Sequence, residues 1–114
     1  MREIVRDKGR IEHMLEAISN VEEFTKGIDG KEFSDSKILF FAVVKNIEIV
    51  GEACYMLTKD FKEAHQSIPW IVIEKMRHVL VHGYYTISPD KVWKTVQEDL
   101  PVLKKQLSNL LMEM

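Results

Sequence analysis

The sequence has few of the features by which secreted, zinc-knuckle and membrane-spanning proteins are recognised. Its 114 residues include one cysteine, Cys54, which excludes an internal disulfide and a CxxC metal knuckle and fits a small buried side chain. The most apolar run, residues 38–44, is far too short to span a membrane. The first residues contain no apolar core of signal-peptide length. We therefore predict a cytoplasmic protein that does not contact a membrane.

The charge is also small. The chain carries 16 basic and 18 acidic side chains, a formal net charge of −2. A protein that binds nucleic acid mainly through bulk charge would be clearly basic, so any contact with nucleic acid must be local. The length fits one domain, and we expect residues 1–114 to form a single helical domain. A chain this short buries only part of its apolar surface alone, which favours self-association.

Glycine and proline are sparse, with five and three residues, and the apolar residues between them follow helical spacing. Five apolar residues follow one another at steps of seven, three, four and three: Ile4, Ile11, Met14, Ile18 and Val21. They predict a first helix over about residues 5–25, followed by a loop at Gly27 and Gly30.

A second helix is predicted from Ser34, a good N-cap residue, to about Leu57. It is apolar nearly all round over residues 38–44, which predicts that it is covered on two sides. One side would face the core and the other a second copy of the chain. Gly51 lies inside this helix at a cost in helix propensity, so we expect another helix to pack close to its backbone.

A third helix is predicted to start near Pro69 and to end at Gly83, in a left-handed conformation. The alternation of apolar and polar residues over 78–82 also fits a strand. No partner strand is visible elsewhere in the sequence, so the helix is the favoured interpretation.

A fourth helix is predicted to begin at Ser88, an N-cap followed by Pro89. Its apolar residues form a coiled-coil-like seam: Trp93, Val96, Leu100, Leu103, Leu107 and Leu110. The seam keeps its phase across Pro101, which predicts a kink or brief break near Asp99 without a change of direction. The predicted fold is all-α, an up-and-down bundle of four to five helices that dimerises.

Candidate chemistry is concentrated at the end of the third helix. Arg77 and His82 are five residues apart, about 140° around a helix and about 7.5 Å along it, so both can border one cleft where the helix ends. Arginine grips phosphate in a bidentate fork, and histidine transfers protons near neutral pH. The pair could therefore cleave a phosphodiester. Alternatively, both side chains simply meet the negative end of the helix dipole.

A two-histidine metal clamp is a competing interpretation. His78 and His82 stand at i and i+4, but no glutamate follows His78, so the HExxH pattern is absent. A catalytic zinc site would need a third ligand from His13, His65, Glu52 or a partner chain. We favour a site without metal or cofactor.

Tyr84 and Tyr85 follow directly, and each could pack in an interface or present a hydroxyl at the cleft. With Tyr84, the segment reads Arg-x4-His-x-Tyr. In this motif the chain resembles the small HepT-like toxins of the HEPN superfamily. The resemblance extends over almost the whole chain, through three further segments: residues 46–53, 68–70 and 93–101. Where that superfamily commonly has Asn or Asp after the motif arginine, this chain has His78, whose ring can hydrogen-bond or assist proton transfer.

The resemblance implies a dimeric bundle in which two motifs face a shared cleft. It implies a metal-independent endoribonuclease in which the ribose 2′-hydroxyl attacks the adjacent phosphate of the RNA substrate, with His82 as general acid/base, Arg77 as phosphate clamp and His78 in support. It further implies a toxin whose antitoxin, a minimal nucleotidyltransferase of the MntA type, silences it by transferring AMP to Tyr84. The alternative is a non-catalytic subunit that binds nucleotide or substrate for such a partner, and His78 leaves this open.

Overall fold

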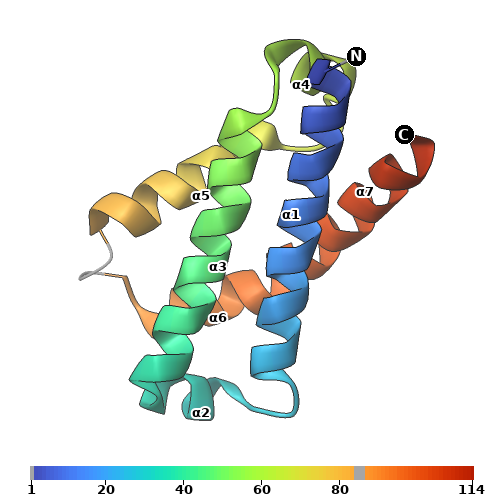
Figure 1. Ribbon diagram of the computed structural model, residues 1–114. Helices are drawn as coiled ribbons and strands as arrows, with labels where there is room; N and C mark the ends of the chain where they lie inside the picture. The colour runs from blue at the N-terminus through green and yellow to red at the C-terminus, as the bar shows by residue number, and fades with distance from the viewer. Residues whose placement is uncertain (1, 84–86) are drawn as a thin grey trace.

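In the computed structural model, the chain forms helices throughout (Figure 1). The structure describes the backbone of residues 2–83 and 87–114 and the side chains of residues 6–80 and 87–114, so Tyr84 and Tyr85 lie outside the described residues. Within these ranges the chain has no strand. The elements are α1 (Arg2–Thr25), α2 (Gly30–Asp35), α3 (Lys37–Met56), α4 (Lys59–Ala64), α5 (Trp70–Gly83), α6 (Pro89–Lys94), a π-helical segment η2 (Thr95–Asp99) and α7 (Leu100–Glu113). The all-α prediction is confirmed.

The long helices pack around α3. Figure 1 shows α1 and α3 side by side, α5 against another flank of α3, and the α6–α7 run crossing the bundle. The last turn of α5 lies at the edge of the molecule (Figure 1). One cluster of buried apolar side chains joins these helices, and its largest fully buried members are Phe33, Ile11, Met14, Ile18, Ile47 and Leu107. The predicted helical faces of α1 and α7 are therefore the faces that the core covers.

The start of α3 differs from the prediction. Ser34, the predicted cap, lies inside the short helix α2, whose own N-cap is Asp29. Ser36 caps α3 instead, and its Oγ accepts a hydrogen bond from the backbone N–H of Leu39 at 3.2 Å. Both serines are good cap residues. The burial of Phe33 against Trp93, with ring centroids 5.2 Å apart, favours the extra turn of helix before Ser36.

The break near Asp99 takes the form of η2. Ser88 caps α6 by accepting from the N–H of Asp90 at 3.1 Å, as the sequence predicts. Pro101 has no N–H and cannot bond to the carbonyl four residues earlier. The helix widens just before it, and the N–H of Leu100 reaches back to the carbonyl of Thr95. Val96, Leu100 and Leu103 remain buried across this segment, so the seam keeps its phase as predicted.

A buried carboxylate ties α1 to α4. Asp7 is 2% exposed, and its oxygens accept from the backbone N–H of Thr58 at 3.0 Å and from the Thr58 hydroxyl at 2.7 Å. The Thr58 hydroxyl also caps α4 by accepting from the N–H of Phe61. Such charge-assisted bonds compensate the desolvation of a carboxylate. This contact fixes the segment that leads into α5.

No helix in the described part of the chain is both long enough and apolar enough to cross a membrane.

Candidate active site

The candidate residues lie on α5, whose N-terminal end is firmly anchored. Trp70 is 5% exposed, and its Nε1 donates to the carbonyl of His65 at 3.0 Å. The backbone carbonyl of Trp70 accepts from the Cys54 thiol at 3.5 Å, which joins α5 to α3. From this anchor α5 continues unbroken to Gly83. The strand interpretation of residues 78–82 is therefore wrong, and the helical one is confirmed.

Arg77 lies where α5 crosses α3. A Cβ placed on Gly51 would be 2.2 Å from the Cβ of Arg77 and 3.2 Å from its Cα and Cγ. Only a residue without a side chain allows the helices to approach this closely. The prediction that another helix packs against Gly51 is confirmed, and that helix carries the candidate phosphate clamp.

The Arg77 guanidinium has no anion within the described side chains. Arg77 is half-buried, and in the described part of the chain it forms no hydrogen bond or ion pair. Other half-buried cations are paired, as Lys62 is with Glu74. An arginine that keeps all five donors free can receive a phosphate without first breaking an ion pair.

The remaining motif residues follow on the last turn of α5 and beyond it. His78 is exposed and directly follows Arg77 on α5, and His82 is the penultimate residue of this helix. The separation of Arg77 and His82 along the axis is thus about five helical rises, about 7.5 Å, as predicted. The His82 side chain and all of Tyr84 lie outside the described residues. The structure therefore places Arg77 and the His82 backbone on one helix end, and leaves the shared cleft a prediction.

The two-histidine metal interpretation gains no third ligand from the described side chains, where no three His, Cys, Asp or Glu residues gather as a metal site. His65 lies near the other end of α5, with its ring 4.7 Å from that of Phe61. A metal site would therefore need ligands beyond the described side chains.

Cys54 is a buried structural thiol, as the sequence indicates. It is fully buried, and burial raises its thiol pKa to about 12, with a smaller contribution from the nearby Glu74 carboxylate. A thiol with this pKa stays protonated at neutral pH and is a poor nucleophile.

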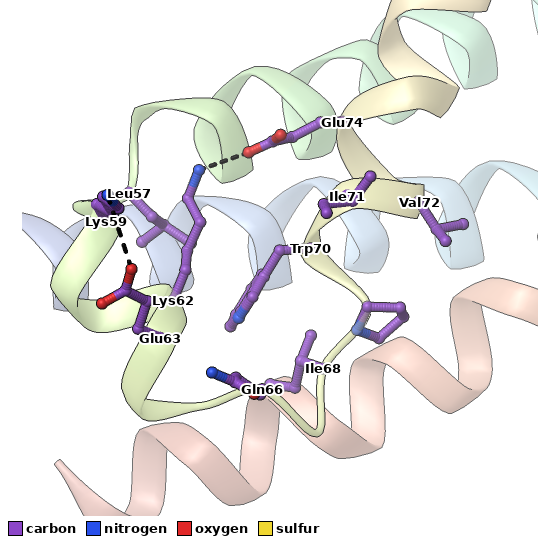
Figure 2. A pocket seen from close by; sticks show the side chains of 11 residues that line it. Leu57, Lys59, Lys62, Glu63, Gln66, Ile68, Trp70, Ile71, Val72 and Glu74 are labelled. Carbon is purple, nitrogen blue, oxygen red and sulfur yellow. Dashed lines mark hydrogen bonds and ion pairs between the residues drawn. The ribbon is translucent and has the colours of Figure 1, made fainter.

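A hollow that the sequence does not predict lies at the start of α5 (Figure 2). Its volume is about 610 Å³, and Trp70, Ile71 and Val72 form part of its apolar lining. The charges around it are already paired, Lys62 with Glu74 and Lys59 with Glu63, as Figure 2 shows. This hollow offers no unpaired charge for catalysis, and it lies about two turns before the motif.

A smaller hollow of about 320 Å³ lies beside the motif, between α3, α5 and α6. Val79, Leu80 and Val92 contribute apolar walls, and Lys91 and Thr95 are its polar residues. It opens on the flank of α5 next to Met76. The apolar lining of this hollow, together with Lys91, therefore lies next to Arg77 along α5.

Sequence comparisons identify similar proteins over most of the chain. A protein of Thermococcus cleftensis, named probable ribonuclease HepT, is 41% identical over 103 residues, which cover 90% of this chain and 94% of the relative. A candidate RNase of Methanocaldococcus jannaschii is 39% identical over 94 residues, 82% of this chain and 86% of the relative. A candidate RNase of Caldanaerobacter subterraneus is 36% identical over 101 residues, 89% and 90% of the two chains.

No solved structure matches the chain. The sequence model of the family described as ribonuclease HepT-like matches residues 14–110, which include α3, α5 and the whole Arg77–Tyr84 motif. A match of this extent, together with the three relatives, shows that the chain belongs to the HepT-like ribonuclease family.

Proposed function

We propose that this protein is a metal-independent endoribonuclease and the toxin of a toxin–antitoxin pair, acting on RNA in the cytoplasm. The observation that carries the proposal is Arg77, whose stem packs at the α3–α5 crossing and whose guanidinium pairs with no anion among the described side chains. The ribonuclease names of its relatives support the choice of substrate.

The proposed reaction uses two groups of the chain. His82 accepts the proton of a ribose 2′-hydroxyl while the 2′-oxygen attacks the adjacent phosphorus. A P–O bond forms to the 2′-oxygen, the bond to the 5′-oxygen breaks, and the leaving oxygen takes a proton from water, which is restored when the His82 imidazolium gives up its proton. Arg77 binds the non-bridging oxygens and neutralises the charge that they gain in the transition state. The products are a 2′,3′-cyclic phosphate and a 5′-hydroxyl.

A second candidate function is supported by two sequence facts. His78 replaces the Asn or Asp common after the motif arginine, and the net charge of −2 gives no broad attraction to RNA. Both facts suit a non-catalytic subunit that binds nucleotide or substrate for a partner nucleotidyltransferase. The two functions differ in whether the chain cuts RNA by itself.

The purified chain should cleave RNA in excess EDTA and leave 2′,3′-cyclic phosphate ends. In-line attack by the 2′-hydroxyl requires no metal when Arg77 supplies the positive charge. The measurement is a single-turnover assay. A control oligonucleotide of the same base sequence, in which deoxyribose replaces every ribose, lacks the attacking 2′-hydroxyl and should resist cleavage. RNA binding without any cleavage would favour the subunit function instead. Cleavage that EDTA abolishes would favour a metal site.

We also propose a homodimer, because α3 and α5 leave apolar side chains uncovered on the described surface. Ile38 is 85% exposed, and Phe41, Tyr55 and Met56 on α3 and Ile71 on α5 are also exposed. Exposed apolar residues gathered on two adjacent helices suit an interface between copies. The second copy would bring its own motif to the cleft.

Sedimentation velocity at micromolar concentration should give twice the 13.3 kDa mass of one chain. Ile38→Glu should shift the protein toward monomer, because it places a charge in the proposed interface. Met112→Glu is the matched control, since Met112 is also 85% exposed but lies on α7. A monomeric wild type, or dissociation by Met112→Glu alone, would contradict this interface.

The proposed antitoxin is a minimal nucleotidyltransferase of the MntA type that transfers AMP to Tyr84. The motif spacing supports this, because Tyr84 immediately follows the last residue of α5. Arg77, with no anion among the described side chains, can then bind the phosphate of the attached adenylate.

A further inference from the structure

At Gly51, α5 approaches the α3 backbone through two atoms of Arg77, its Cα and Cβ, that side-chain rotation cannot move. Three atoms of Arg77, its Cα, Cβ and Cγ, lie within 3.2 Å of the place where a Gly51 side chain would begin. The Cα and Cβ positions follow the α5 backbone and do not depend on the side-chain rotamer. A side chain at position 51 could therefore be accommodated only if α5 moved as a body or tilted away from α3.

The rest of the crossing leaves little room for such a movement without loss of contacts. Val50 and Cys54 on α3 and Ile73 and Leu80 on α5 are buried on both sides of the Gly51–Arg77 contact. The Cys54–Trp70 hydrogen bond holds the start of α5 to α3. A displacement at residue 51 would thus act first on Arg77, whose stem makes the contact.

Arg77 depends on this packing for its position. No ion pair or hydrogen bond orients its guanidinium within the described side chains, so the restraint that the structure shows is the contact of its stem with the α3 backbone. A stem packed in this way lowers the number of conformations that the charged end can adopt.

Three other glycines have surroundings that the structure describes, and none of the three touches a candidate site residue. A Cβ on Gly9 would meet nothing within 4 Å, and Gly27 has a φ of 75° in the turn after α1. A Cβ on Gly30 would lie 3.1 Å from the ring of Trp93, at the far end of the bundle from α4. Gly51 differs from these glycines because a candidate site residue, Arg77, occupies the space that a side chain at position 51 would need.

We propose that Gly51 is the positioning residue for the phosphate clamp: it lets α5 approach α3 until the Arg77 stem is fixed on the α3 backbone. This inference rests on the proposed function for its catalytic consequence. Its structural part, that Gly51 sets the position of Arg77, can be tested without activity.

The test compares three single substitutions. Gly51→Ala should lower the single-turnover rate of RNA cleavage by about 10²-fold, the loss that a displacement of about 1 Å can cause. Gly9→Ala makes the same chemical change in open space and should leave the rate unchanged. Val50→Ala removes fully buried atoms one residue away and should lower the melting temperature while keeping the rate, measured well below that temperature.

A double-mutant cycle separates positioning from a general structural role. If Gly51 acts through Arg77, Gly51→Ala/Arg77→Ala should be as slow as Arg77→Ala alone, within about twofold. If the two losses multiply, Gly51 acts by another route and the inference is overturned. Should Gly51→Ala fold poorly, the cycle is repeated with Gly9→Ala added, because alanine at that open helical position favours the helix.

A second measurement does not use activity. The Nε–H resonance of Arg77, assigned from its loss in Arg77→Lys, should shift in Gly51→Ala and stay in place in Gly9→Ala. A wild type that cuts no RNA would overturn the proposed function but leave this measurement decisive for Gly51. A cleaving wild type whose rate and Arg77 resonance survive Gly51→Ala would overturn the inference alone.

Discussion

Replacing either Arg77 or His82 with alanine should reduce the rate of RNA cleavage by about 10²–10⁴-fold, the usual range for losing a general acid/base or a transition-state charge partner. The two residues supply different things, a fixed positive charge and a proton transfer, so neither can replace the other. Arg77→Lys should recover only part of the loss, because an ammonium cannot form the bidentate fork with two phosphate oxygens.

The folded state should survive both substitutions. Arg77 makes no ion pair or hydrogen bond within the described side chains, so its truncation removes stem packing and leaves no buried charge unpaired. Circular dichroism and melting temperature would verify this. Suitable controls are His65→Ala, a histidine near the other end of α5, and Lys75→Ala, an exposed cation on the same helix. Full cleavage by both motif variants would mean that the reaction takes place elsewhere.

The helices were predictable because their signals are local. Apolar spacing defined the buried faces of α1 and α7, and the Ser88–Pro89 pair marked the start of α6 correctly. The sequence predicted Ser34 as the cap of α3 and the structure has Ser36, because one serine cannot be distinguished from another nearby as the cap without knowing what Phe33 packs against. That partner is Trp93, sixty residues away in the sequence. The short helices α2 and α4 were missed for the same reason, since their stability comes from such contacts.

Part of the site was also predictable. A glycine inside a helix signals a close neighbour, and the structure identifies that neighbour as Arg77. The sequence could not reveal which helix would approach, because this depends on how α3 and α5 cross. It also gave no sign of the hollow around Trp70, which forms from α4, α5 and the connection between them.

Tyr84 should be the residue that the partner nucleotidyltransferase modifies, and Tyr85 should not. Tyr84 is the tyrosine of the Arg-x4-His-x-Tyr motif and follows Gly83 directly in the sequence. For Tyr85 we expect a different direction and packing against the fourth predicted helix. Incubation with the adjacent nucleotidyltransferase and ATP should add mass in multiples of one adenylate, mapped to Tyr84. Tyr84→Phe should abolish the added mass, and Tyr85→Phe should retain it.

Attachment of an adenylate should also abolish cleavage. We expect the modification to add an anionic phosphate and a bulky nucleoside close to the Arg77 guanidinium, which pairs with no anion among the described side chains and would otherwise bind a phosphate of the RNA. Blocking is then both electrostatic and steric, and removal of the adenylate should restore the rate. The decisive comparison is neutralisation of wild type against Tyr84→Phe by the same partner. If the partner silences both equally, it acts by binding alone; if the adenylate is found only on Tyr85, the regulatory position is one residue further from Arg77 than the motif predicts.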